Sequence, residues 1–116
     1  MNTTEALKLR LEYELLEVQQ EILILLETHS EPEYLALKNL LLCSKIADWP
    51  EKIGEHVPEK IRRKKLRIEQ TQAALIQLEL GFYGFCADCD APIEIHLLES
   101  DPATQRCANC QNRTAK

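Results

Sequence analysis

No hydrophobic run in the sequence is long enough to cross a membrane. The longest uninterrupted run, Ile22 to Leu26, is far shorter than the roughly 18 apolar residues that a membrane helix requires. The first residues also lack a basic segment followed by an apolar block and a small-residue cleavage site, so no secretory signal is visible. Both absences predict a cytoplasmic protein with no membrane partner.

The sequence has no excess of positive charge. It carries 14 lysines and arginines against 19 aspartates and glutamates, for a formal net charge of -5. Because lysine and arginine supply nonspecific affinity for nucleic acids, this balance argues against direct DNA or RNA binding. Patterns for a Ser-His-Asp triad, a Cys-His pair or a phosphate-binding loop are also missing, so we expect no enzymatic activity.

The 116 residues suit one globular domain, or a helical domain with a small appendage. An amphipathic helix is predicted from Thr3 or Thr4, as its cap, to about Thr28. Its apolar residues alternate four and three apart and form a heptad seam of Leu11, Leu15, Val18, Ile22 and Leu25. A second stripe seven apart, at Leu9, Leu16 and Leu23, predicts that this helix packs against more than one neighbour.

Two further helices are predicted on either side of a turn region at 48–58, which contains prolines and a glycine. The second helix takes Ser30 as its N-cap and Pro32 in its first turn, and it runs to about Ala47. The third begins near Pro58, and its apolar residues recur at sevens, at Ile61, Ile68, Leu75 and Phe82. The positions between them are polar near its start. We therefore expect tight packing near residue 80 and looser, wetter packing near the turn.

Five cysteines are present, and four of them form two C-x2-C pairs, at Cys86 and Cys89 and at Cys107 and Cys110. An odd count without an export signal favours metal ligation over disulfides, and the spacing C-x2-C-x17-C-x2-C is typical of a four-cysteine zinc site. With all four positions filled by protein, the predicted zinc ion is structural and not catalytic. Residues 83–116 have too little apolar surface to fold unaided, and metal binding supplies the missing energy.

The fifth cysteine, Cys43, and the histidine at position 96 are expected to have ordinary structural roles. Cys43 is expected to be a small buried thiol in the middle of the second helix. His96 lies inside the cysteine segment, but a closed four-cysteine shell does not need it, so we expect it at the surface or beside the ligands.

Together these features predict a mainly α fold. It consists of an antiparallel helical hairpin of coiled-coil type, an extra N-terminal helix and a small C-terminal four-cysteine zinc finger. The predicted domains are a helical domain at 1–82, whose hairpin turns at about 48–58, and a zinc finger at 83–116.

The stretch GFYGFCADCDAPIEIHLLESDPATQRCANCQ, at 81–111, resembles the zinc finger of the DksA/TraR family. The shared features are a glycine-aromatic approach, an isoleucine, a leucine-acid pair, a proline and the cysteine pairs: Gly84, Phe85, Cys86, Cys89, Ile93, Leu98, Glu99, Pro102, Cys107 and Cys110. The resemblance implies a monomeric regulator that inserts a helical hairpin into the secondary channel of bacterial RNA polymerase. Such a regulator alters transcription initiation without binding promoter DNA itself.

The resemblance also implies acids at the hairpin turn, after an aromatic-proline pair. The predicted partner-binding residues at this tip are Asp48, Trp49, Glu51 and Glu55. The family's second acid is replaced by Gly54, and Glu55 or Asp48 is a candidate to compensate for it. Trp49 is either a contact at the tip or a plug between the helices.

A basic stretch follows the turn, from Lys60 to Arg67. Under the resemblance it lies along the hairpin near the rim of the polymerase channel. The alternative is an ordinary solvated helix face whose bases pair with the glutamates of the first helix.

The resemblance places three non-basic residues where family members that use guanosine tetraphosphate carry basic ones: Gln70, Asp101 and Gln111. Because an acid repels a polyphosphate, we expect this protein to act independently of that alarmone. The alternative function is a zinc-stapled helical interaction module whose protein partner is not polymerase. A DNA-binding zinc finger is disfavoured by the acidic charge and by the lack of a basic recognition helix.

Overall fold

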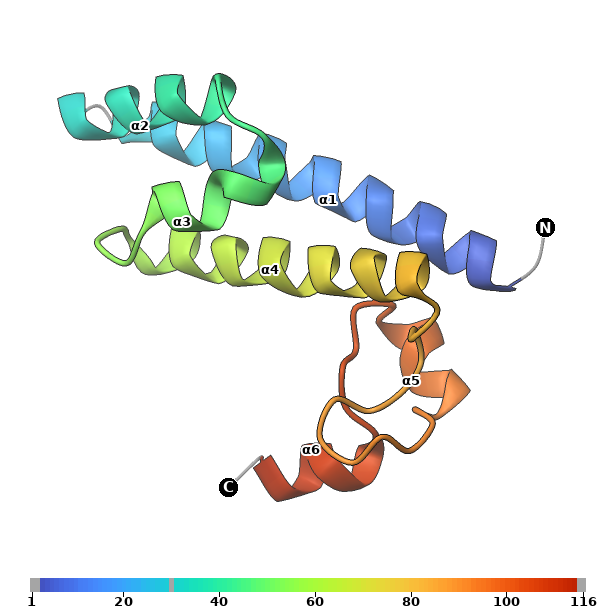
Figure 1. Ribbon diagram of the computed structural model, residues 1–116. Coiled ribbons are helices and arrows are strands. Elements are labelled where there is room, and N and C mark those ends of the chain that lie inside the picture. The colour runs from blue at the N-terminus through green and yellow to red at the C-terminus, as the bar shows by residue number, and fades with distance from the viewer. Residues whose placement is uncertain (1–2, 30, 115–116) are drawn as a thin grey trace. The chain divides into compact units, whose positions relative to one another are not determined.

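The computed structural model describes residues 3–29 and 31–114, and their regular structure is helical apart from one isolated bridge between Phe85 and Pro92. In chain order the helices are α1 (Thr3–Thr28), α2 (Pro32–Leu42), the 3-10 turn η1 (Ile46–Asp48), α3 (Trp49–Ile53), α4 (Glu59–Leu80), α5 (Ile95–Ser100) and α6 (Ala108–Thr114) (Figure 1). None of these helices is long and apolar enough to span a membrane. The predicted mainly α fold with a hairpin and a C-terminal four-cysteine segment is confirmed.

By their internal packing the residues form two compact units. The first, here called the turn unit, is Leu15–Glu69. The second, the finger unit, combines Met1–Glu14 with Gln70–Lys116. Both long helices, α1 and α4, contribute one segment to each unit. The division at residue 82 that the sequence suggested stays a prediction.

The turn unit is built on an apolar core to which four helices contribute. Within it α1 and α4 run antiparallel (Figure 1). Glu21 of α1 forms an ion pair with Lys64 of α4. The buried side chains of the core are Val18, Ile22, Leu26, Leu41, Trp49, Ile53, Ile61 and Ile68. Each fully buried Leu or Ile side chain stabilises the folded state by about 1.5–3 kcal/mol. This core, rather than helix propensity, holds the short helices α2 and α3 in place.

The segment between α2 and α4 is more helical than predicted. The second helix ends at Leu42 and not near Ala47, because the N–H groups of Cys43 and Ser44 close its last turn through bonds of 3.2 and 3.0 Å. Part of the predicted turn region forms α3, whose Trp49 and Ile53 lie one helical turn apart and enter the core. Ser30, the predicted cap of α2, lies outside the described residues, and the N-cap position belongs to Glu31.

The expected packing gradient along α4 is wrong. Ile61 and Ile68, near the turn, are fully buried, whereas Leu80 and Phe82 are each 64% exposed. The reason is that α2 and α3 bring Leu41, Trp49 and Ile53 against the start of α4. A heptad pattern read from one helix does not reveal partners supplied by other segments.

One of the two predicted stripes on α1 packs as expected and the other does not. Leu11, Val18 and Ile22 of the heptad seam are buried. Of the second stripe, Leu9 is 52% and Leu16 is 62% exposed, and only Leu23 packs against the core of the turn unit. The prediction that α1 packs against more than one neighbour is nevertheless confirmed, because the core of the turn unit joins it to α2, α3 and α4.

In the finger unit, α1 and α4 pack against the cysteine segment through two small clusters. Leu11 and Ala74 meet Ala103 in one cluster. Leu7 joins the cysteine residues in the other, together with Ile93 and Leu98. Arg10 of α1 also donates a hydrogen bond of 2.7 Å to the main-chain oxygen of Glu99, at the end of α5.

Thr71 is the weak point of the finger unit's interior. Its side chain is fully buried, and its hydroxyl has no hydrogen-bond partner among the described residues. A buried hydroxyl without a partner costs about 1–3 kcal/mol.

The substitution Thr71→Val, which keeps the shape, should raise the free energy of unfolding by about 1 kcal/mol in urea titrations. Thr71→Ser keeps the hydroxyl and removes the methyl group, so it should lower that free energy; a destabilised valine variant would contradict the prediction.

Candidate metal centre

The first cysteine pair lies in a tight turn that its own backbone closes. The N–H of Cys86 donates to the oxygen of Ala91 at 2.7 Å, and the N–H of Asp90 donates to the oxygen of Cys86 at 3.0 Å. Asp90 has a φ of 61°, a left-handed conformation that Asp tolerates better than most residues. Gly84, with a φ of +91°, turns the chain into this loop, and its oxygen accepts from the N–H of Ile93 at 2.7 Å. These bonds direct the first pair of sulfurs to one side of the loop.

The second cysteine pair stands at the start of α6, where a glutamate from a distant loop caps the helix. Both carboxylate oxygens of Glu94 accept from the N–H of Ala108, at 3.2 and 3.3 Å. The N–H of Gln111 then donates to the oxygen of Cys107 at 2.9 Å. The sequence reasoning missed Glu94, because nothing in the spacing of an acid and a helix start so far apart indicates that they meet.

The structure brings all four predicted ligands together. The sulfur atoms of Cys86, Cys89, Cys107 and Cys110 all lie within 4.8 Å of one another. The distance between Sγ of Cys89 and Sγ of Cys107 is 3.7 Å, close to the edge of about 3.8 Å in a tetrahedron with Zn–S bonds of about 2.3 Å. The four cysteines therefore fit one structural zinc ion, with Cys89 exposed and the other three ligands buried.

The surroundings of the four sulfurs also shift the pKa values of Cys86 and Cys110. A hydrogen bond from the backbone of Cys107 is the main cause that lowers the pKa of Cys86 to about 6. Hydrogen bonding to Cys86 and the other sulfurs raises the pKa of Cys110 to about 12. Four thiolates so close together repel one another, and a bound divalent ion removes that penalty. An ion pair of 2.6 Å between Nε of Arg106 and Oδ2 of Asp88 further joins the two cysteine loops.

The comparisons with known proteins agree with this geometry. Residues 81–114 match the prokaryotic dksA/traR C4-type zinc finger family. This segment is therefore similar to the DksA/TraR-type zinc finger. No curated protein matches the chain by sequence. Among solved structures, the chain resembles the transcription factor DksA2 from Pseudomonas aeruginosa, with a TM-score of 0.60, 22% sequence identity, and coverage of 95% of this chain and 81% of that one. This likeness concerns the fold.

Two residues outside the ligand set behave differently from each other. His96 is exposed on α5 of the DksA/TraR-type finger and is not part of the sulfur cluster, in line with its predicted surface role. Cys43 was expected to be buried in mid-helix, and this is wrong, because its thiol is exposed. The physical reason is that α2 ends at Leu42, so Cys43 occupies the C-cap position at the edge of the core.

The predicted tip residues all belong to the turn unit, but their surroundings differ. Trp49 is buried in the core, and its Nε1 donates to the oxygen of Ser44 at 3.4 Å, so it acts as a plug. Asp48 and Glu51 are exposed. The carboxylate of Glu55 binds Nζ of Lys65 at 2.7 Å.

The basic stretch is largely engaged in ion pairs within the turn unit. Lys64 pairs with Glu21 of α1, as the pairing interpretation proposed. Arg62 and Arg63 both bind Glu59, the latter at 3.2 Å and in the next helical turn. These pairs favour the solvated-face interpretation of the stretch.

The zinc site predicts the metal content of the purified chain and of its cysteine variants. The purified chain should contain one zinc ion, and Cys107→Ala should lose it, because three remaining thiolates leave the coordination shell incomplete. Metal analysis gives the stoichiometry, and amide NMR spectra should report loss of order in the finger, since zinc binding supplies about 10 kcal/mol or more of its folding energy. Cys43→Ser is the matched control and should keep the ion. Stoichiometric zinc in the alanine variant would contradict the assignment.

Proposed function

We propose that this chain regulates transcription by binding bacterial RNA polymerase. In this proposal it acts as a cytoplasmic monomer, the turn of its helical hairpin enters the secondary channel, and no contact with DNA is needed. The observation that carries the proposal is a DksA/TraR-type finger on the same chain as a helical turn that presents Asp48 and Glu51 to solvent.

Two further observations support it. The fold resembles that of a protein described as a transcription factor, and the similarity covers 95% of this chain. The antiparallel helices α1 and α4 flank the segment that carries Asp48 and Glu51, which gives that segment a packed support.

The charges of the chain fit a partner other than nucleic acid. The formal net charge is -5, and zinc bound by four thiolates makes it more negative. Lys64, Arg62 and Arg63, which could otherwise contact phosphates, bind carboxylates within the turn unit.

The test of this function separates binding from action. Purified chain should co-elute with core polymerase on gel filtration and change initiation in vitro. Glu51→Ala should remove most of the effect on initiation and leave binding intact, because it removes one exposed carboxylate without touching the core. Glu33→Ala, at an exposed acid of α2, is the control and should change neither property. If the wild-type chain does not bind polymerase, the proposed function is wrong.

Independence from guanosine tetraphosphate is part of the proposal. Asp101 accepts a hydrogen bond of 3.0 Å from the N–H of Ala103, and Nε2 of Gln111 donates to the oxygen of Arg106 at 2.9 Å. These side chains serve the finger itself, and a carboxylate at Asp101 repels a polyphosphate. In vitro transcription with wild-type chain should therefore give the same effect with and without the alarmone. A strong enhancement by the alarmone would contradict this prediction.

A second candidate function rests on the exposed apolar side chains of α1. Leu16 and Ile24 face solvent in the turn unit, so their apolar side chains are available for contact with a partner protein. A zinc-stapled interaction module with a partner other than polymerase would use such side chains. Failure of the chain to co-elute with polymerase would favour this candidate.

A further inference from the structure

Helix α3 carries Glu51 and is too short to be stable by itself. It has five residues, whereas isolated helices need about 12–15 residues to be even marginally stable in water. Trp49 and Ile53 bury one face of α3 in the core of the turn unit. Glu51 lies between them in sequence and is exposed on the other face. The direction in which Glu51 points therefore depends on whatever fixes α3.

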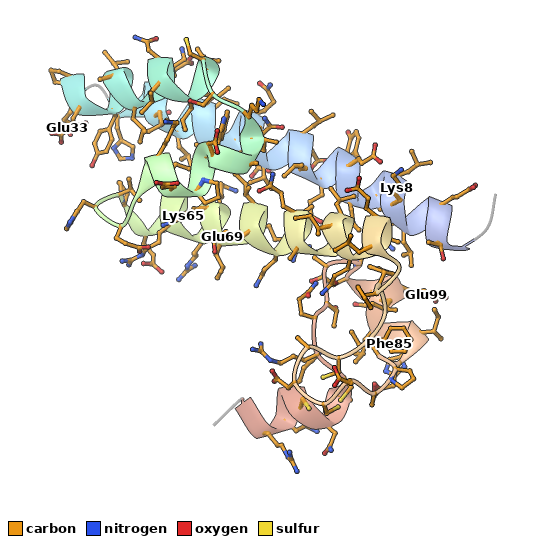
Figure 2. The ribbon with its side chains drawn as sticks, in the orientation of Figure 1. Lys8, Glu33, Lys65, Glu69, Phe85 and Glu99 are labelled. Carbon is orange, nitrogen blue, oxygen red and sulfur yellow. The ribbon has the colours of Figure 1, made fainter. Side chains whose placement is uncertain are left out.

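The C-terminal end of α3 is held by a lysine from α4. Lys65 is only 8% exposed, and its Nζ donates to the main-chain oxygen of Gly54 at 2.9 Å and to Oε1 of Glu55 at 2.7 Å (Figure 2). Gly54 is the C-cap of α3, and its own N–H bonds the oxygen of Pro50 at 3.2 Å. A buried ammonium group needs such partners, because burial without them is costly. Its positive charge also suits the carbonyl end of a helix.

The positive charges around Glu55 favour its ionised form, which is the form that pairs with Lys65. A hydrogen bond from Lys65 and the charge of Lys65 are the main causes that lower the pKa of Glu55, and Arg62 and His56 act in the same direction. The carboxylate is therefore ionised at neutral pH. Gly54 has a φ of +69°, which few other residues adopt easily, so the loop that Lys65 binds has a specific shape.

We propose that Lys65 is the positioning residue of the tip: by binding Gly54 and Glu55 it fixes the end of α3 and thereby orients Glu51 toward the partner. Glu55 then belongs to this clamp and is not the acid that replaces the missing second one. The inference rests on the proposed function for the identity of the partner, whereas the clamp itself is a property of the free chain.

The clamp is tested without polymerase. In Lys65→Met, which keeps the apolar stem, the pKa of the Glu55 carboxyl should rise toward its ordinary value when followed by NMR, because Lys65 is the main cause that lowers it. Protection of the Gly54 N–H against hydrogen exchange should fall about tenfold, the size expected for the loss of one hydrogen bond to a charged group. Lys65→Arg should restore both. Glu55→Gln, which keeps an oxygen acceptor, serves as a second variant should the methionine variant fold poorly, and it should lower the same protection. Unchanged protection in both variants would overturn the clamp.

The positioning role is tested with core polymerase. Lys65→Met should reduce the effect on initiation about tenfold, as Glu51→Ala does, while co-elution with polymerase is retained. Lys64→Met is the matched control: it removes a neighbouring ion pair with Glu21 but leaves Gly54 untouched, and it should act like wild type. Full activity of Lys65→Met, with protection at Gly54 lost, would overturn the positioning role. Absence of binding by the wild type would overturn the proposed function instead, and the NMR result would still decide the clamp.

Discussion

Repulsion among four sulfur atoms, and its relief by one cation, is the constraint on which the finger depends. The sulfurs lie within 4.8 Å of one another, which is a stable arrangement for thiolates only around a metal ion. The helices α5 and α6 are both short, and few apolar side chains lie beneath them. The zinc site therefore supplies folding free energy that the small core does not provide, and Glu94 and Arg106 hold the loops around the site.

The turn unit depends instead on packing, because α3 is too short to be stable by itself. Trp49, the aromatic residue between the exposed acids Asp48 and Glu51, is buried in the core of this unit. Trp49 and Ile53 anchor α3 in the core, which leaves Glu51 on the outer face. Lys65 completes the arrangement from α4. The same five-residue helix thus both packs into the core and leaves Glu51 exposed.

The errors of the sequence interpretation share one cause. Cys43 is exposed, Leu16 is exposed, and the start of α4 is better packed than its end, all against expectation. Periodicity along one helix reports which residues share a face, but it does not report which segment covers that face. Here α2 and α3 cover the start of α4, whereas Leu9 and Leu16 of the second stripe of α1 remain exposed in the structure.

The sequence by itself determined the zinc ligands and the long helices, because these depend on local spacing. Two C-x2-C turns predict their metal, and the heptad pattern of α1 predicts its extent to Thr28. Only the tertiary structure decided that Trp49 is a plug, that Glu94 caps α6 and that Lys65 holds Gly54. Each of these contacts joins residues that local periodicity does not relate, and only the folded chain brings them within hydrogen-bonding or packing distance.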